Sequence, residues 1–311
     1  MTREVDVLVI GGGLAGLSAA LTSARLGRST AVLTGGVLGG QLVSIEKIDG
    51  VPGFPDGVPG YDLCPMAQEQ AVAAGAELVA ASADALEADG ERWRATSTEG
   101  ALSARAVVLA TGAAIAPLVV PGEGRLAGKG VSQCASCDAP LLRGKTAVVV
   151  GGGDSGLQEA LTLAEHVERV VLVERGAALS GQASYREAVS AHPRIELRFG
   201  TVVSEILGDD GVRGVRIAAA DGGGADELPA DAVFPFPGLV PDTRLVRGLV
   251  ALDAAGRIAV DAALRTSARG ICAAGNVRQG SPHRAAAAMG DGAAAAVTLD
   301  RYLATGDWPG G

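Results

Sequence analysis

The sequence predicts an α/β protein built from two related domains, and three observations support this prediction. A strand–turn–helix–strand pattern occurs twice in the 311 residues, and the second copy starts 140 residues after the first, with Gly151 in the place of Gly11. Each copy opens with a short aliphatic run, which is typical of a strand buried on both faces. Hydrophobic residues make up 48% of the chain, so both domains can bury a core.

The glycine pattern G-x-G-x-x-G follows the first strand of each copy, at residues 11–16 and 151–156. The first glycine of such a pattern permits a tight turn, the second lets a pyrophosphate approach the backbone, and the third lets helix and strand pack closely. The N-terminus of the next helix adds partial positive charge for the phosphates. Both copies reach the end of their second strand 23 residues after the first glycine. We therefore predict two Rossmann-like domains, each binding a dinucleotide.

The two copies differ at the end of that second strand, where Thr34 stands in the first copy and Glu174 in the second. A carboxylate at this position hydrogen-bonds a ribose 2′-hydroxyl and disfavours a 2′-phosphate. The second copy is therefore predicted to bind a nicotinamide nucleotide. In the first copy the ribose must be bound in another way.

Two further buried strands, predicted at 107–113 and 270–276, lie on either side of the second copy. The simplest organisation is a discontinuous first domain, which the second domain interrupts and a C-terminal helix completes. We place the first domain at 1–113 and 245–311, and the inserted second domain at 114–244.

Cys134 and Cys137 form a C-x-x-C motif just before the first strand of the second copy. A zinc site requires four ligands, but the histidines are scattered and no second C-x-x-C exists. Two idle buried cysteines at this spacing would be a coincidence, whereas a redox pair explains it, because C-x-x-C allows a reversible disulfide within one helical turn. We favour the redox pair. The adjacent Asp138 is interpreted as the acid that protonates a leaving thiolate, or alternatively as an ordinary solvated or capping residue.

Composition argues against several other classes of protein. The formal charge is −9 and no stripe of Lys and Arg offsets it, so nucleic acid is not expected as a partner. The longest apolar region, 106–121, is too short and too broken by Gly and Pro to span a bilayer. No signal-peptide pattern opens the chain, and we expect a cytoplasmic protein.

Taken together, these motifs resemble the low-molecular-weight thioredoxin reductase family, which is a class of pyridine nucleotide-disulfide oxidoreductases and includes the reductase core of alkyl hydroperoxide reductase. The position of the dithiol, ahead of the second glycine motif, separates this family from glutathione-reductase-like enzymes. The resemblance covers nearly the whole chain and rests on the segments 11–16, 39–42, 110–113, 134–138, 151–156 and 275–276.

The resemblance implies FAD in the first domain and NADH or NADPH in the second. It also implies that Cys137 faces the flavin, that Asp138 is the proton donor, and that Cys134 exchanges with an external disulfide. The expected partner is a thioredoxin-like or glutaredoxin-like protein or a small-molecule disulfide, and the expected assembly is a homodimer. The flavin carries the difficult chemistry, while the protein supplies orientation and electrostatics.

The sequence departs from this family at three places. The basic cluster that binds the 2′-phosphate of NADPH is replaced by Glu174 and a single Arg175, so we expect NADH to be preferred. The family's Gly-Asp near the C-terminus is Gly275-Asn276, and its Arg-Gln-Ala is the segment 283–285, which reads His-Arg-Ala. The last two changes predict a different polar environment around the flavin.

Two alternatives to an NAD(P)H-dependent disulfide reductase remain open: a flavin dithiol oxidase that uses oxygen, and a redox or nucleotide sensor without turnover. The candidate catalytic residues are Cys134, Cys137 and Asp138, and no metal site is expected. The candidate cofactor-binding residues are Gly11, Gly13, Leu14, Ala15, Gly16, Thr34, Gly40, Gln41, Thr111, Gly112, Gly275, Asn276, Arg284 and Ala285 in the first domain, and Gly151, Gly153, Asp154, Ser155, Gly156, Glu174 and Arg175 in the second.

Overall fold

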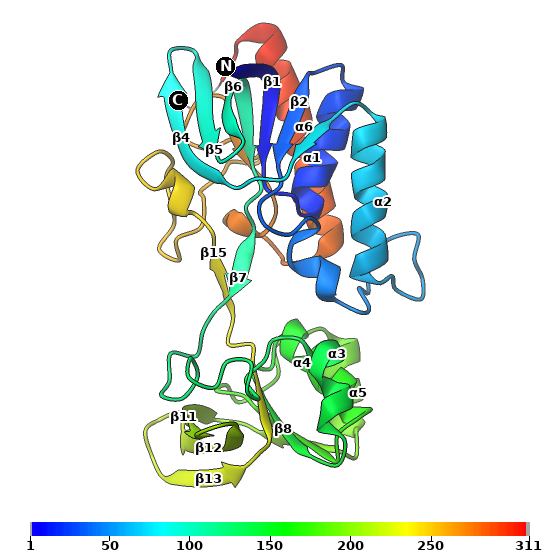
Figure 1. The fold of residues 1–311 in the computed structure, drawn as a ribbon, viewed down its shortest axis with the longest axis vertical. Coiled ribbons are helices and arrows are strands. Elements are labelled where there is room, and N and C mark those ends of the chain that lie inside the picture. Colours follow the sequence, from blue (N-terminus) through cyan, green and yellow to red (C-terminus); the bar gives the residue numbers. More distant parts are fainter. Residues whose placement is uncertain (1, 309–311) are drawn as a thin grey trace. The chain divides into compact units, whose positions relative to one another are not determined.

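The computed structural model describes residues 2–308, and its chain divides into two compact units (Figure 1). Unit 1 comprises the chain up to Ala114 together with the chain from Val240 onward. Unit 2 comprises Ile115–Leu239. Each unit has its own sheet and its own hydrophobic core, as described below.

Two short strands carry the chain from one unit to the other. They are β7 (Ala113–Ile115) and β15 (Leu239–Pro241), and they pair with each other as a two-stranded sheet. The boundaries expected from the sequence lie after residues 113 and 244, so the return to unit 1 occurs earlier along the chain than expected.

Unit 1 is built on a seven-stranded sheet in the order β3-β2-β1-β6-β5-β4, with β16 paired to β6. Strands β1, β2, β3, β6 and β16 run parallel, whereas β4 and β5 pair antiparallel with each other and extend the sheet from β6. The elements of this unit are β1 (Arg3–Ile10), α1 (Leu14–Arg25), β2 (Thr30–Leu33), α2 (Gly60–Ala73), β3 (Glu77–Val79), β4 (Ala83–Asp89), β5 (Arg92–Ser97), β6 (Gly100–Leu109), β16 (Ile271–Ala273) and α6 (Ala285–Thr305).

The central strands of unit 1 are buried on both faces, because successive side chains of a strand point to opposite sides. Val7 and Val9 of β1 pack into the core that the helices α1, α2 and α6 cover (Figure 1). Leu8 and Ile10 pack into the opposite core, which includes Val246 and other residues of the returning segment. The aliphatic run at the start of the chain is therefore a doubly buried strand, as predicted.

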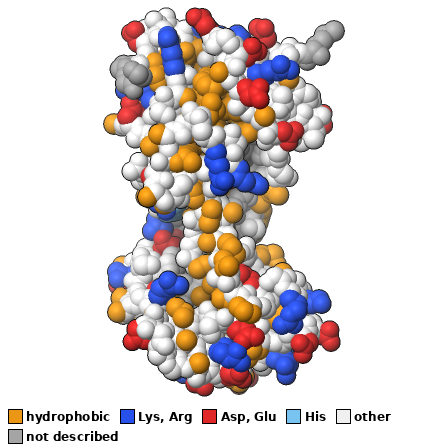
Figure 2. Space-filling view, turned by 90° about the vertical axis from the view of Figure 1, so that its left-hand side faces the viewer, with side chains coloured by type: hydrophobic (Ala, Val, Ile, Leu, Met, Phe, Trp, Pro, Cys, Tyr) orange, Lys and Arg blue, Asp and Glu red, His pale blue; other side chains and the backbone are white. Residues whose placement is uncertain are grey.

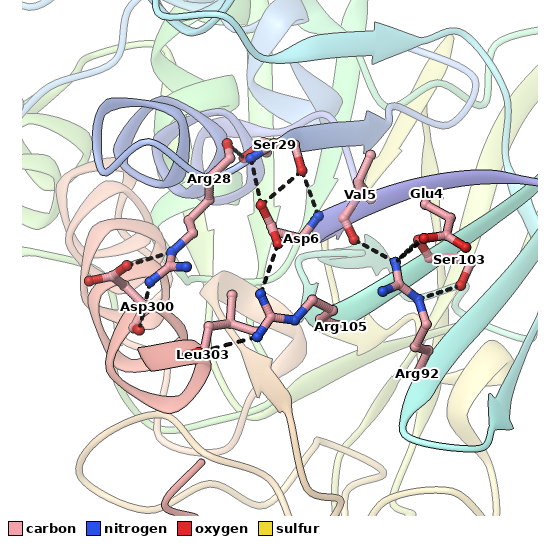
Figure 3. A network of polar contacts seen from close by, with 11 residues as sticks. Glu4, Val5, Asp6, Arg28, Ser29, Arg92, Ser103, Arg105, Asp300 and Leu303 are labelled. Atoms are coloured by element: carbon pink, nitrogen blue, oxygen red, sulfur yellow. Dashed lines mark hydrogen bonds and ion pairs between the residues drawn. The ribbon is translucent and has the colours of Figure 1, made fainter. Parts of the chain in front are cut away.

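A network of polar contacts holds the returning helix α6 onto the start of the sheet (Figure 3). The Arg28 side chain donates from Nε to Asp300 Oδ1 over 2.7 Å. The Arg105 side chain donates to Asp6 Oδ1 over 3.0 Å and to the carbonyl oxygen of Leu303 over 3.2 Å. Because Asp300 and Leu303 lie near the end of α6, these bonds join parts of unit 1 that are far apart in the sequence.

Unit 2 repeats the parallel arrangement on a smaller scale, with a four-stranded sheet in the order β10-β9-β8-β14. Helices α3, α4 and α5 contribute to the core on one face, and the antiparallel sheet β11-β12-β13 covers the other. The elements are α3 (Ala135–Asp138), β8 (Thr146–Val150), α4 (Asp154–Ala164), β9 (Arg169–Val173), α5 (Ala183–Ala191), β10 (Ile195–Arg198), β11 (Thr201–Gly208), β12 (Val212–Ala219), β13 (Ala225–Pro229) and β14 (Ala232–Pro235). The predicted α/β fold with two Rossmann-like halves is thereby confirmed.

The surface carries charges of both signs. On the face drawn in Figure 2, Lys and Arg side chains lie among Asp and Glu side chains on both units. Within residues 2–308, no helix is long and apolar enough to cross a bilayer.

Candidate nucleotide sites and redox dithiol

The first glycine loop has a backbone that only glycine fits. Gly11 has a φ of +119°, and a Cβ at this position would lie 2.1 Å from the carbonyl oxygen of Ala110. A Cβ on Gly16 would lie 1.9 Å from the carbonyl oxygen of Gly11, so helix α1 packs directly against the loop. A Cβ on Gly13, in contrast, would meet nothing within 4 Å. The loop is thus closed on the protein side and open where a pyrophosphate would approach.

The second glycine loop has the same geometry. Gly151 has a φ of +111°, and its Cβ would lie 2.2 Å from the carbonyl oxygen of Phe236. A Cβ on Gly156 would lie 1.9 Å from the carbonyl oxygen of Gly151, and a Cβ on Gly153 would have only the Ser180 hydroxyl, at 3.9 Å. Both loops therefore fit a dinucleotide pyrophosphate at the start of the following helix.

Several predicted residues of unit 1 lie around its glycine loop. The Gly39 amide donates to the carbonyl oxygen of Gly12 over 2.9 Å, and a Cβ on Gly40 would lie 3.5 Å from Gly13 Cα. Gln41 follows on an exposed 3-10 turn, Gly40–Ser44. These glycines lie 27 residues beyond their partners in the loop, and no sequence pattern indicates this contact, which the fold creates.

The segment after β6 closes another side of the same loop. A Cβ on Gly11 would lie 3.0 Å from the Thr111 amide nitrogen. The Thr111 hydroxyl donates to the carbonyl oxygen of Asp242 over 2.6 Å, and the Asp242 amide donates to the carbonyl oxygen of Gly112 over 3.0 Å. Thr111 and Gly112 are therefore held beside the loop by the returning segment of unit 1.

A pocket of about 480 Å³ opens at the carboxyl ends of β2 and β3. Thr34 lines it, although the Thr34 side chain is largely buried and its hydroxyl lies 3.3 Å from the carbonyl oxygen of Val79. Carboxyl ends of parallel strands are where open α/β sheets bind nucleotides. The pocket lining is Thr34, Gly35, Gly36, Leu38, Gln68, Leu78, Ala80, Ala81, Ser82, Asp84 and Thr98, which offers a mixed apolar and polar surface to an adenosine.

The turn at Gly275 and Asn276 reaches the first glycine loop from the C-terminal part of the chain. A Cβ on Gly275, which has a φ of +78°, would lie 2.9 Å from Ala15 Cβ. The Ser281 hydroxyl donates to Asn276 Oδ1 over 3.0 Å, which fixes the orientation of that amide. Arg284 and Ala285 lie at the start of α6, where Arg284 is the N-cap residue.

An ion pair that the sequence analysis missed supports this turn. Arg278 donates to both carboxylate oxygens of Asp291, over 2.6 and 2.8 Å, and the two side chains are only 15% and 11% exposed. Asp291 also accepts a hydrogen bond from the Gly275 amide over 3.0 Å. A carboxylate thus contacts the turn from α6, although Asn276 itself carries no charge. The only sequence signal was an acidic residue inside an otherwise Ala- and Gly-rich helix start.

His283 lies two residues before the start of α6. Burial lowers the pKa of His283, and the neighbouring Arg257 and Arg284 lower it further. The lowered pKa favours the neutral imidazole at this helix start.

Glu174 contacts the second glycine loop directly. Its Oε2 accepts a hydrogen bond from the Gly152 amide over 2.5 Å, and its Oε1 accepts one from the Gly176 amide over 2.6 Å. Each oxygen has a second lone pair for a ribose hydroxyl. The neighbouring Arg175 is exposed. The carboxylate predicted from the spacing therefore lies in a fixed orientation beside the loop.

The start of helix α4 is also tied to the segment after β9. Asp154 Oδ1 accepts a hydrogen bond from the Gln182 amide over 2.7 Å. The Ser180 amide donates to the carbonyl oxygen of Gly152 over 2.9 Å. Ser155, one residue further along α4, is exposed.

Cys134 and Cys137 are joined by a disulfide, with their Cα atoms 5.3 Å apart. Cys134 is the N-cap of the four-residue helix α3, and its Sγ accepts a hydrogen bond from the Cys137 amide over 3.3 Å. Cys137 is exposed and Asp138 is half-buried at the end of the same turn. Cys64 and Cys272, in contrast, are free and buried, and burial raises the pKa of both thiols. The chain thus carries one disulfide-bonded pair with an accessible cysteine and two buried free thiols.

Comparison with known proteins identifies the family. Residues 5–292 match the family model described as pyridine nucleotide-disulphide oxidoreductase. The chain is 35% identical over 305 residues to thioredoxin reductase from Treponema pallidum, a match that covers 98% of this chain and 99% of the relative. It is 36% identical over 303 residues to thioredoxin reductase from Mycolicibacterium smegmatis, covering 97% of each. The crystal structure of Lactococcus lactis thioredoxin reductase superposes with a TM-score of 0.93 at 32% identity, covering 96% of this chain and 99% of that one.

The fold and the dithiol define a two-domain nucleotide-dependent oxidoreductase, and the chain belongs to the pyridine nucleotide-disulphide oxidoreductase family. Within that family it is a disulfide reductase similar to the low-molecular-weight thioredoxin reductases, and its cofactors are FAD and a nicotinamide nucleotide. The resemblance read from the sequence motifs is confirmed.

Proposed function

We propose that unit 1 binds FAD, that unit 2 binds the nicotinamide nucleotide, and that Cys134 and Cys137 pass the electrons to a thioredoxin-like protein. The observation that carries this proposal is the Cys134–Cys137 disulfide on an accessible turn of unit 2. Bound FAD supplies the two-electron transfer from the nicotinamide to this disulfide. The open sides of the loops at Gly13 and Gly153 support one dinucleotide in each unit.

The chain's own residues then carry out disulfide exchange. In the reduced dithiol, Cys134 attacks a sulfur of the partner disulfide, which forms a mixed disulfide and releases one partner thiolate. Cys137 attacks the Cys134 sulfur, which releases the second partner thiolate and restores the Cys134–Cys137 disulfide. Two electrons leave the dithiol, and the two protons of its thiols end on the partner. Asp138, in the same turn as Cys137, supplies the proton when the Cys134–Cys137 disulfide is opened.

NADH is the preferred donor in this proposal because of Glu174. Its carboxylate, held by the Gly152 and Gly176 amides, offers acceptors to two ribose hydroxyls and repels a 2′-phosphate. Arg175 is the one basic residue beside it. One relative, from Arabidopsis thaliana, is named NADPH-dependent thioredoxin reductase 3, so both nucleotides need to be compared directly.

The test is an anaerobic titration of the purified flavoprotein with NADH and with NADPH, followed by an oxidised thioredoxin. We expect the flavin to bleach within minutes with NADH, more slowly with NADPH, and to regain its colour when thioredoxin is added. Cys134→Ser should retain flavin reduction by NADH and lose thioredoxin reduction by more than about 100-fold. Oxygen uptake driven by dithiols, without flavin reduction by either nucleotide, would instead identify a dithiol oxidase.

The proposal also includes a homodimer and a cytoplasmic location. A disulfide reductase of this kind acts where thiols are kept reduced, which is the case in the cytoplasm. The assembly is tested by sedimentation of the FAD-loaded protein, and a mass of a single chain at micromolar concentration would contradict the dimer.

A further inference from the structure

Two segments from the C-terminal part of the chain pack against the first turn of helix α1, where the glycine loop of unit 1 ends. A Cβ on Gly275 would lie 2.9 Å from Ala15 Cβ. A Cβ on Gly292, in α6, would lie 2.1 Å from the carbonyl oxygen of Ala15 and 2.9 Å from the amide nitrogen of Ala19. The turn at Gly275 and helix α6 therefore lie directly beside the helix start at which the FAD pyrophosphate is proposed to bind.

A largely buried ion pair joins these two segments next to that contact. Asp291, which precedes Gly292 in α6, accepts a hydrogen bond from the Gly275 amide over 3.0 Å. Arg278 donates to the same carboxylate from Nε over 2.6 Å and from Nη2 over 2.8 Å. The Arg278 and Asp291 side chains are only 15% and 11% exposed. The fold thus brings a carboxylate close to the start of α1 and pairs it with a guanidinium.

The charge of Asp291 bears on FAD binding because the pyrophosphate of FAD is also anionic. A helix start attracts anions through its exposed amides, and a carboxylate close by opposes that attraction. Solvent screens a largely buried charge much less than an exposed one. The positive guanidinium of Arg278 cancels the charge of the carboxylate. Asp291 can therefore hold the Gly275 amide without adding net negative charge beside the pyrophosphate site.

We propose that Arg278 is a positioning residue for FAD, which acts through Asp291. It orients the carboxylate that holds the Gly275 turn, and it neutralises a charge that would otherwise repel the pyrophosphate. The inference rests on the proposed binding of FAD in unit 1. It gives a role in FAD affinity to two residues that lie outside both glycine motifs.

Two single variants and their combination test the role of the charge. Arg278→Gln leaves Asp291 charged and unpaired, whereas Asp291→Asn keeps an oxygen for the Gly275 amide and leaves Arg278 unpaired. We expect the dissociation constant of FAD to rise about 100-fold in Arg278→Gln and to stay within about threefold of the wild type in Asp291→Asn. In the double variant it should rise only about tenfold, because the unpaired carboxylate is gone.

The measurement starts from the FAD-loaded protein. The protein is diluted in steps and ultrafiltered, and the fluorescence of the filtrate gives the free FAD at each step. Arg257 and Arg284, which lie near His283 before α6, are the same in every variant, so differences between variants report the Arg278–Asp291 pair.

An ion pair with a structural role alone predicts another order of affinities. Both single variants lose the same pair, so both would weaken FAD binding equally, and the double variant would bind no better than either. Arg278→Lys keeps the positive charge without the two-pronged contact, and it should restore the dissociation constant to within about tenfold of the wild type. Equal weakening in the two single variants would overturn the inference.

The double variant still decides the question if Arg278→Gln fails to fold. It lacks the positive charge that Asp291→Asn retains, so it should bind FAD more weakly than Asp291→Asn. Equal affinity of these two proteins would overturn the inference.

The Arg28–Asp300 pair near the other end of α6 is the matched control (Figure 3). Its Nε and Oδ1 atoms are 2.7 Å apart, and the two side chains are 23% and 28% exposed. Arg28→Gln and Asp300→Asn should each keep the dissociation constant of FAD within about twofold of the wild type. A change as large as that in Arg278→Gln would show that a loosened α6 weakens FAD binding, and it would overturn the role of the charge.

These measurements use neither NADH nor thioredoxin, so the inference and the proposed function fail in different ways. If Gly11→Ala keeps FAD, the assignment of FAD to unit 1 is wrong, and the inference fails with it. If Gly11→Ala loses FAD but Arg278→Gln and Asp291→Asn bind it equally well, only the role of Arg278 is wrong.

Discussion

The glycine loops of unit 1 and unit 2 have nearly the same backbone but different chemistry at the end of the second strand. In unit 1 the amide of Gly12 donates to the backbone carbonyl of Thr34 over 3.1 Å. In unit 2 the equivalent amide, that of Gly152, donates to the side-chain carboxylate of Glu174. The carbonyl oxygens of Gly12 and Gly152 accept backbone hydrogen bonds in both units, from Gly39 and Ser180.

In the proposed assignment, this difference adapts one loop backbone to two nucleotides. The pyrophosphate-binding backbone depends on sterics and is the same in both copies. The distinguishing group lies at the end of the second strand, where only unit 2 carries a charge. The choice of nucleotide can therefore be changed by side chains while the loop itself is kept.

The largest expected effect comes from replacing the first glycine of either loop. An Ala at Gly11 or Gly151 must adopt a φ above +100° and place its Cβ within 2.2 Å of a carbonyl oxygen, so the loop must shift. Gly11→Ala should lose FAD, with an affinity at least about 100-fold weaker. Gly151→Ala should remain yellow and be reduced by dithionite, while reduction by NADH slows by about 100-fold or more.

Two glycines outside the loops serve as controls for backbone strain alone. Gly27 in unit 1 and Gly144 in unit 2 have φ values of +80° and +69°, and a Cβ on either would meet nothing within 4 Å. Gly27→Ala and Gly144→Ala should keep both nucleotides. Loss of FAD in Gly151→Ala, with retained NADH binding, would reverse our assignment of the two loops.

An intermediate effect is expected at the group that distinguishes the loops. Glu174→Gln keeps an acceptor oxygen but no longer repels a 2′-phosphate, so the ratio of kcat/KM for NADH to that for NADPH should fall about tenfold. Arg175→Gln should move the same ratio in the opposite direction, because it removes the one basic residue beside the site. Steady-state kinetics with both nucleotides measures the two shifts, and an unchanged ratio in Glu174→Gln would show that the carboxylate does not select the nucleotide.

The smallest effect concerns the far end of the unit 1 sheet, at Asp6 (Figure 3). Burial alone would raise the pKa of Asp6, but hydrogen bonds from Ser29 and Arg105 outweigh it and hold this pKa below its ordinary value of 3.8. A carboxyl group whose pKa is lower in the folded than in the unfolded protein stabilises the fold at pH values above its unfolded-state pKa. This contribution is lost as the pH falls through its folded-state pKa.

Asp6→Asn should therefore lower the free energy of unfolding by about 1 kcal/mol near neutral pH. The difference in free energy of unfolding between this variant and the wild type should shrink as the pH falls below 3.8, the ordinary pKa of Asp. It should vanish at pH values below the pKa of Asp6 in the folded protein. Urea denaturation at several pH values measures it. Asp89→Asn, at an exposed carboxyl at the end of β4, is the control, and an equal loss in that variant would exclude a specific role for the Asp6 network.

The site residues illustrate what spacing along the chain can and cannot predict. The positions of Gly11, Gly151 and Glu174 follow from local geometry, because a strand, a tight turn and a helix of fixed length bring them together. The contacts of Glu159 with Ala135 and of Asp291 with Gly275 do not follow from any local pattern. Both depend on helices packing against distant turns, and a single acidic residue in a helix gives no sign of its partner.

The sequence by itself determined the α/β class, the two glycine loops, the C-x-x-C pair and the family, because each depends on short stretches in which sterics and burial act locally. The tertiary structure decided how those stretches are completed. It brought Gly40, Thr111 and Gly275 around the first loop, held Glu174 against the second, and placed the Glu159 carboxylate at the start of the dithiol helix. The physical reason is that hydrogen bonds and packing between distant segments form only once the sheets have brought those segments together.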